Sequence, residues 1–405
     1  MAVLSPFRAV RPHARAAARV AAVPYDVVNT EEARALAAGD PLSFLHVSRA
    51  EIDLPPDTDP HSGAVYELAV DNYERLKRDA PMLTEETPSV YVYRLRTDGH
   101  EQTGIAACYS IDEYDRDLIK KHERTRRDKE DDRTRHLLDL RAQTGPVFLV
   151  YRAAAAIDAV VARVAASTPL YTFTAADGVQ HTLWRVAPRD MAALVECFAA
   201  LPALYIADGH HRAASAARAR RELRGTTGAA GEWDTFLAVA FPDSQVRILP
   251  YNRVVRDLGS MTSASLLRAL SERFTIGKGS AVPERRGDVS MFLEDEWHTL
   301  TLGGARYDVS PADRLDVSRL QDEVLTPVLG IGDVRTDPRI DFVGGIRGAT
   351  ALESLVRSGR AAVAFSMYPT AVDDLMTIAD AGGIMPPKST WFEPKLRDGL
   401  LIHEI

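Results

Sequence analysis

Cysteine, positive charge and long apolar runs are all scarce in this sequence, and each shortage excludes a class of protein. Only 2 cysteines occur among the 405 residues, and Cys108 and Cys197 share no CxxC spacing. A disulfide framework and a cysteine-rich zinc site are therefore excluded. The 49 Lys and Arg residues are outnumbered by 57 Asp and Glu residues, which leaves a net charge of -8. This balance argues against nucleic acid as a partner, because binding to the phosphate backbone needs a basic surface.

A membrane span is not expected either. No stretch reaches about 18 uninterrupted apolar residues, the length that a helix needs to cross a bilayer. The N-terminal segment is rich in arginine, but Pro6, Pro12 and Pro24 interrupt it and no continuous apolar segment follows. It therefore does not resemble a signal peptide. We expect a cytoplasmic protein with no membrane partner.

The composition, with 46% hydrophobic and 26% charged residues, is that of a globular protein. Segments with strand and helix patterns alternate along the chain, which predicts an α/β fold or a mixed α+β fold. The length predicts two or three domains. We expect an N-terminal α/β region over residues 1–110, a core over residues 111–260 and a C-terminal α/β region over residues 261–405.

Three local patterns predict elements that matter below. Asn29 or Thr30 can cap a helix over residues 31–37, because Asn and Thr side chains accept hydrogen bonds from the first turn. Apolar alternation on both sides of Thr97-Asp98-Gly99 predicts a β-hairpin. A short apolar run at residues 203–207 predicts a strand, and the segment rich in alanine and arginine after residue 212 predicts a helix.

The junction between that strand and that helix is the strongest candidate for a functional site. It reads Asp208-Gly209-His210-His211-Arg212. Gly209 permits a tight turn, and the start of a helix directs backbone N–H groups and the positive end of its dipole to one place, which suits a phosphate. His210, His211 and Arg212 add donors, and Arg212 can hold phosphate oxygens in a bidentate manner. The alternative is an ordinary helix start with solvated polar side chains.

A metal ion is a further candidate ligand of this junction. Asp208, at the end of the strand, could hold Mg²⁺, which prefers oxygen ligands. Zinc is not expected, because the adjacent His210 and His211 project in different directions and lack the His-x3-His spacing of a helical zinc site.

A dense run of charge over residues 120–133 is the second feature. Such a run is typical of a solvated segment with many ion pairs. His122 and Glu123 stand out, because they lie just before a helix that leads into a buried strand. A carboxylate among cationic neighbours stays ionised and can serve as a general base, so Glu123 is a candidate catalytic residue.

A third feature is the segment over residues 385–396. Lys388-Ser389-Thr390 is similar to the end of a P-loop, but the upstream Gly-x4-Gly is absent, so this is not a Walker motif. Lysine and hydroxyl side chains held between prolines could still contact a nucleotide or a phosphate. The alternative is a rigid loop that packs Trp391 and Phe392 on the core.

In their order along the chain, these motifs resemble the DUF1015 family of bacteria and archaea. A His-Glu pair, a helix, a strand led by proline, and a strand that ends in Asp-Gly-His-His-Arg also resemble the ParB/sulfiredoxin-like superfamily with its free serine kinases. The DUF1015 resemblance covers essentially the whole chain. The motifs that carry it are Pro24-Tyr25-Asp26-Val27, Lys121-His122-Glu123, residues 129–133, residues 208–212, Leu249-Pro250-Tyr251-Asn252-Arg253 and residues 386–395.

The resemblance implies a ParB/sulfiredoxin-like core with large additional N- and C-terminal regions and an insertion at about residues 152–202. In activity it implies a kinase that uses ATP or ADP with Mg²⁺ to phosphorylate the hydroxyl of free serine or a similar small compound. Glu123 would be the general base with His122 beside it, and Asp208 would face the metal or the phosphates. The phosphates would lie on residues 209–212 and on residues 388–390. The chain is longer than the free serine kinases.

Other members of the superfamily fit less well. Sulfiredoxins need a cysteine in the turn where this chain has His210, so reduction of a sulfinic acid is excluded. ParB proteins bind DNA through a separate basic domain, which the acidic composition does not favour. A non-catalytic regulator that binds a nucleotide is the alternative that stays open, and a homodimer is compatible with either function.

Overall fold

The computed structural model describes residues 2–80, 82–304 and 308–405. The chain divides into two compact units, one of Met1–Val246 with Pro394–Ile405 and one of Arg247–Glu393. These two units do not coincide with the three regions that the sequence predicts. The first 110 residues and the residues up to 246 build one unit together, because their strands share one sheet.

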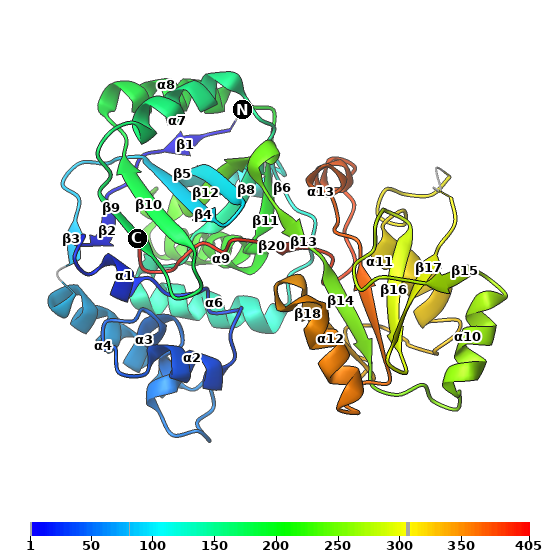
Figure 1. Ribbon diagram of the computed structural model, residues 1–405. Coiled ribbons are helices and arrows are strands. Elements are labelled where there is room, and N and C mark those ends of the chain that lie inside the picture. The colour runs from blue at the N-terminus through cyan, green and yellow to red at the C-terminus, as the bar shows by residue number, and fades with distance from the viewer. Residues whose placement is uncertain (1, 81, 305–307) are drawn as a thin grey trace. The chain divides into compact units, whose positions relative to one another are not determined.

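The first unit is built around a nine-stranded sheet in which the strand order is β6-β11-β8-β12-β5-β4-β10-β9, with β1 paired to β5 (Figure 1). The pairs β6/β11 and β8/β12 are parallel and the other pairs are antiparallel. The expected mixed α/β class is therefore confirmed. The strands are β1 (Leu4–Ser5), β4 (Tyr91–Thr97), β5 (His100–Ser110), β6 (Ile119–Lys120), β8 (Val147–Tyr151), β9 (Tyr171–Thr174), β10 (Gln180–Arg185), β11 (Leu204–Asp208) and β12 (Thr235–Pro242).

One face of this sheet is a continuous apolar surface. The register places Val92, Ile105, Ala240, Leu149 and Ile206 side by side across five strands, and all five side chains are buried. Helices cover this face and complete the core. They are α7 (Ala155–Ala165), α8 (Pro188–Ala199) and α9 (His210–Thr227). The hairpin of β4 and β5 confirms the prediction, and Gly99 in its turn has a φ of 72°.

A second layer of the same unit joins the N-terminal residues to the C-terminal ones. A four-stranded sheet in the order β3-β2-β21-β7 brings the last strand of the chain beside the second. Its strands are β2 (Ala9–Pro12), β3 (Met82–Thr84), β7 (Ala142–Gln143) and β21 (Ile402–Glu404), and the nearby helices are α1 (Ala17–Val20), α2 (Thr30–Ala37), α3 (Leu45–Ser48), α4 (Gly63–Asp79) and α6 (Arg127–Leu140). Helix α5 (Ile111–Asp115) instead contacts β6 and α9. The predicted cap of α2 is confirmed, because the Asn29 side chain accepts a hydrogen bond from the Glu32 N–H.

The second unit is a six-stranded antiparallel sheet in the order β15-β17-β16-β19-β14-β18. Its strands are β14 (Tyr251–Val255), β15 (Thr275–Lys278), β16 (Asp288–Leu293), β17 (Glu296–Thr301), β18 (Ile340–Gly344) and β19 (Val363–Met367), and a separate pair joins β13 (Ile248–Leu249) to β20 (Trp391–Phe392). The helices are α10 (Ser263–Ser271), α11 (Asp316–Leu320), α12 (Gly348–Arg357) and α13 (Val372–Asp380). In the three described segments of the chain, no helix is both long and apolar enough to cross a bilayer.

The close approach of β5 to β12 at Gly104 leads to a stability prediction. A Cβ atom at Gly104 would lie 2.8 Å from the Ala240 carbonyl oxygen and 2.8 Å from the Phe241 ring. Because a well-packed core cannot take up an added methyl group without shifts, we expect Gly104→Ala to lower the free energy of unfolding by about 1–3 kcal/mol. Gly277→Ala is the matched control, since Gly277 is also a strand glycine but has no atom within 4 Å of its Cβ position. Calorimetric melting temperatures that agree for the two variants would contradict this account.

Candidate functional site

The predicted strand–turn–helix at Asp208 is confirmed. Strand β11 ends at Asp208, Gly209 is the N-cap with a φ of 92°, and α9 begins at His210. An L-residue rarely adopts this conformation, and a Cβ atom at Gly209 would lie 3.0 Å from Arg212 Nε. The N–H groups of the first turn have no partner within the helix and point along its axis, away from the helix body. The junction therefore has the backbone geometry that a phosphate needs.

The structure brings the His-Glu motif to this junction. Strand β6 is parallel to β11, so the residues that follow β6 lie beside the turn that follows β11. The His122 N–H donates to His210 Nε2 at 3.4 Å, and the two rings meet edge to face with centroids 4.5 Å apart. The Arg126 N–H donates to His211 Nε2 at 3.0 Å. Two motifs that are distant in sequence thus lie in contact with each other.

The histidines of this site are neutral at physiological pH. His122 and His210 are 3% and 4% exposed. Burial lowers the pKa of His122 to about 4, and burial together with the neighbouring His122 lowers the pKa of His210 well below its ordinary value. Because His210 Nε2 accepts a hydrogen bond, the single ring proton of neutral His210 belongs on Nδ1. That atom lies 3.7 Å from Glu123 Oε2.

Glu123 differs from these histidines because its side chain is half exposed. Its carboxylate faces the Nδ1–H of His210. A carboxylate in this position can accept a proton, and His210 can restrain its orientation without taking the proton itself. The predicted role of Glu123 as a base is compatible with this geometry and stays a prediction.

Asp208 is paired with a lysine. Lys395 Nζ lies 3.1 Å from Asp208 Oδ2, and Arg212 Nη2 lies 3.9 Å from the same oxygen. Burial by itself would raise the pKa of Asp208, but the charges of Lys395 and Arg212 and the lysine hydrogen bond outweigh burial and lower that pKa far below its ordinary value. Asp208 is therefore ionised. The Lys395 ammonium contacts one carboxylate oxygen of Asp208, which is the residue that the sequence predicts to hold Mg²⁺.

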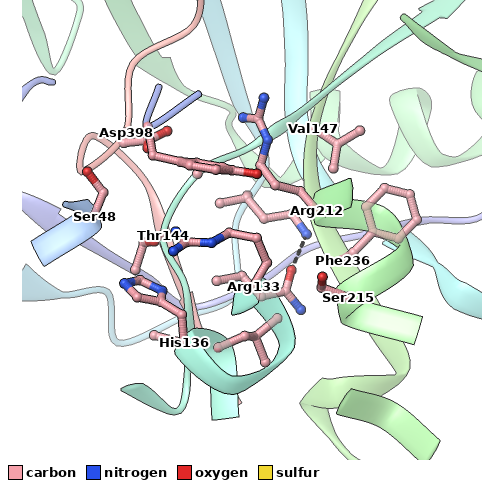
Figure 2. A pocket seen from close by; sticks show the side chains of 15 residues that line it. Ser48, Arg133, His136, Thr144, Val147, Arg212, Ser215, Phe236 and Asp398 are labelled. Carbon is pink, nitrogen blue, oxygen red and sulfur yellow. Dashed lines mark hydrogen bonds between the residues drawn. The ribbon is translucent and has the colours of Figure 1, made fainter. Parts of the chain in front are cut away.

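The Arg212 side chain is largely buried, and its predicted role in binding phosphate stays a prediction. Its Nη1 donates to the Pro146 carbonyl oxygen at 2.7 Å, and its guanidinium lines a cavity in the first unit (Figure 2). Burial opposes its charge, but the carboxylates of Asp26, Asp208 and Asp398 outweigh this effect and raise the pKa of Arg212. The same guanidinium also lies beside Gly209 and Asp208, so Arg212 borders both the helix start and the cavity.

One group of side chains could hold a metal ion. Ligand atoms of His122, Glu123 and His210 lie within 4.8 Å of one another. In the sequence, the spacing of His210 and His211 argues against a zinc site. The structure adds His122 and Glu123, from a distant segment, to the candidate metal ligands. A metal at Nδ1 of His210 would have to displace the proton that the tautomer places there. The group offers a single carboxylate, whereas Mg²⁺ prefers oxygen ligands.

Lys388, Ser389 and Thr390 belong to the second unit. The Lys388 ammonium lies 5.3 Å from the centroid of the Tyr251 ring, and the buried Ser389 hydroxyl donates to the Pro386 carbonyl oxygen at 2.6 Å. The Ser389 hydroxyl therefore stabilises the turn in which it lies. The expected proximity of residues 388–390 to the Asp208 junction stays a prediction.

Lys395 is the functional candidate that the sequence reasoning missed. It lies in the same lysine-containing tail, but the similarity of residues 388–390 to the end of a P-loop drew the assignment to Lys388 instead. The available signal was the pair Pro394-Lys395, which follows the apolar Trp391 and Phe392. Its partner Asp208 could not be identified from spacing, because nearly half of the chain lies between them.

Comparisons with known proteins identify the family of this chain but not its activity. A family model described as "Protein of unknown function (DUF1015)" matches residues 4–318. No curated protein matches the chain.

Among solved structures, a mutant of a free serine kinase in complex with AMP is 12% identical, with a TM-score of 0.36, over 72% of this chain and 92% of that chain. A conserved hypothetical protein from Pyrococcus furiosus is 13% identical, with a TM-score of 0.35, over 74% and 95% of the two chains. SbnI with a C-terminal truncation, from Staphylococcus aureus, is 10% identical, with a TM-score of 0.38, over 74% and 87%. Similarity this low carries no argument about the ligands of this chain.

The pair of Asp208 and Lys395 leads to a prediction with a defined pH dependence. Lys395→Met keeps the length of the side chain but removes its charge, so we expect a loss of about 1–3 kcal/mol in the free energy of unfolding at pH 7. Because the pKa of Asp208 is lowered in the folded state, its stabilisation is complete above the unfolded value of about 3.9 and is lost as the pH falls through the folded value. The difference between parent and variant should therefore be constant near neutrality and shrink in acid. Urea unfolding across this pH range measures it.

The control for this measurement is Lys278→Met, which removes an exposed lysine of β15. It should leave the free energy of unfolding unchanged at every pH. Equal stability of Lys395→Met and the parent at pH 7 would show that the ion pair contributes nothing.

Proposed function

The chain belongs to the DUF1015 family, as its motifs predict, and we propose that it is a nucleotide-dependent kinase of a small hydroxy compound such as free serine. The observation that carries this proposal is the position of Glu123. Its carboxylate lies 3.7 Å from a buried histidine at the first position of α9, where backbone N–H groups converge. A candidate base thus lies beside a candidate phosphate site, which is what transfer of a phosphoryl group to an alcohol requires.

The proposed phosphate site combines two sources of positive potential. The helix start supplies N–H groups and the positive end of the dipole. Lys395 supplies an ammonium group next to Asp208. The transferred group carries negative charge on its oxygens, so a catalyst of this reaction works mainly by positioning and by charge neutralisation. The buried neutral imidazoles of His122 and His210 exclude water on one side.

This donor set suits the expected Mg²⁺ only when phosphate oxygens of the nucleotide supply further ligands. Magnesium is commonly bound through one or two carboxylates together with substrate phosphates. Asp208 and Glu123 are the carboxylates of this junction, and Asp208 at the end of β11 is the residue that would hold the ion. When bound, Mg²⁺ would neutralise charge on the phosphates.

The proposed chemistry is a single displacement. The acceptor hydroxyl oxygen forms a bond to the terminal phosphorus of the nucleotide, and Glu123 accepts the hydroxyl proton. The bond between that phosphorus and the bridging oxygen breaks, and the shortened nucleotide leaves: ADP when ATP is the donor, or AMP when ADP is the donor. His210 restrains the Glu123 carboxylate and stays neutral throughout.

The role of Glu123 is tested by Glu123→Gln. Glutamine keeps the size of the side chain but cannot accept the proton, so nucleotide affinity should be unchanged and kcat should fall by about 10²–10⁴-fold. Consumption of ATP and of ADP is measured with hydroxy amino acids, hydroxy acids and polyols as acceptors, and affinity is measured by calorimetry. The control is Glu222→Gln, an exposed carboxylate on α9, which should change neither quantity.

Two results would count against this proposal. If Glu123→Gln retains the turnover of the parent, Glu123 is not the general base. A parent protein that binds nucleotide but consumes none of it with any acceptor would favour the alternative, a nucleotide-binding regulator.

The phosphate site is tested by two glycines at opposite ends of α9. Gly209 and Gly228 both have a positive φ, 92° and 68°. Alanine at either position costs on the order of 1–2 kcal/mol because of the left-handed conformation. Only Gly209→Ala should also move the N–H groups of the first turn, so we expect its nucleotide affinity to fall at least tenfold. If calorimetry shows equal nucleotide affinities for Gly209→Ala and Gly228→Ala, the nucleotide does not bind at this helix start.

A further inference from the structure

The cavity beside Arg212 is a small, partly open cavity of the first unit, and both apolar and charged side chains line it. Its volume is about 50 Å³, which is room for about four water-sized groups at roughly 10–15 Å³ each. Figure 2 shows that Arg133, Arg212 and Asp398 face this space, with the hydroxyl of Ser48 at its edge. These residues come from α6, α9, the C-terminal segment and the end of α3, so only the folded chain assembles them. A nucleoside is too large for this space, whereas a very small metabolite is not.

Three buried polar atoms on the wall of the cavity have no hydrogen-bond partner among the described residues. They are Ser48 Oγ, Arg212 Nε and Asp398 Oδ1. Ser48 is 3% exposed and Asp398 is 2% exposed. Buried polar groups in native proteins are nearly always hydrogen-bonded, so three such atoms around one cavity indicate a polar occupant. The atoms include a donor, an acceptor and a hydroxyl that can act as either.

The wall carries charges of both signs. The Arg133 guanidinium stacks 4.3 Å from the centroid of the Tyr25 ring, and its Nε lies 2.8 Å from Asp132 Oδ2. Arg212 adds a second guanidinium. Asp398 is the carboxyl group of the wall, and burial raises its pKa to about 7 even though Arg212 acts to lower it. This carboxyl group is poised to become fully ionised when a cation is placed beside it.

We propose that this cavity binds a small zwitterionic α-amino acid, with its carboxylate toward Arg212 and Arg133 and its ammonium group toward Asp398. A carboxylate accepts hydrogen bonds from guanidinium groups, and an ammonium group donates to a carboxylate, so the ligand would satisfy the unpartnered atoms of the wall. The binding itself does not depend on phosphotransfer, but the identification of this ligand with the phosphoryl acceptor rests on the proposed function.

A ligand series measured by calorimetry on the full chain, with and without saturating AMP, tests the ligand class. L-Alanine and L-serine should bind, whereas propionate, which lacks the ammonium group, and ethylamine, which lacks the carboxylate, should bind at least tenfold more weakly. L-Alanine has no side-chain hydroxyl and cannot be phosphorylated. Its binding therefore reports on the cavity alone. If neither amino acid binds, or if propionate binds as tightly as L-alanine, the proposal is overturned and the cavity holds water or a simple anion.

Variants of the wall test the site. Asp398→Asn removes the negative charge at almost unchanged size and should weaken L-alanine binding at least tenfold, while Asp71→Asn, an exposed carboxylate of α4, should not. Should Asp398→Asn fail to fold, Ser48→Ala removes only a hydroxyl and should weaken binding about threefold or more. Unchanged affinity in the folded variants would place the ligand elsewhere.

The same measurements separate this inference from the proposed kinase. Binding of L-alanine in a protein that consumes no nucleotide would support the amino acid site in the cavity and contradict the proposed kinase activity. The opposite result is consumption of nucleotide with a polyol or hydroxy acid, while neither amino acid binds. This result would support the proposed kinase activity and contradict the amino acid site in the cavity.

Discussion

The candidate site depends on one short parallel pairing, that of β6 with β11. The two residues of β6 pair with the first two residues of β11, so both chains leave the sheet at the same edge. The segment after β6 carries His122 and Glu123, and the segment after β11 turns at Gly209 into α9. Hydrogen bonds from two backbone N–H groups to His210 and His211 then hold the two segments together. Without this pairing, the carboxylate and the helix start would have no fixed relation.

Burial determines which groups at this junction carry charge. His122 and His210 are buried, and the cost of burying an imidazolium keeps both neutral. Asp208 is also buried, but Lys395 compensates its charge and keeps it ionised. The C-terminal segment of residues 394–405 is therefore electrostatically part of the first unit, and it contributes Lys395 to the junction and Asp398 to the cavity. A ligand that enters this region meets fixed charges rather than flexible surface side chains.

Local patterns predicted much of the fold correctly. The hairpin at Gly99, the cap at Asn29 and the strand–turn–helix at Asp208 all follow from residue types within a few positions of one another, and the structure contains them. The contacts between distant segments were not predictable in the same way. The burial of Arg212, the pairing of Lys395 with Asp208 and the assembly of the cavity depend on side chains that approach one another only after the sheet has formed.

The mixed α/β class, the family and the two motifs that meet at the junction could be predicted from the residues alone, because these depend on local periodicity, on turn chemistry and on the order of motifs. The folded chain was needed to establish the charge states of His210 and Asp208, the tautomer that faces Glu123 and the arrangement of two arginines and one aspartate around a common cavity. The physical reason is that burial and neighbouring charge set the state of an ionisable group, and both are properties of the packed chain rather than of the residues beside it in sequence.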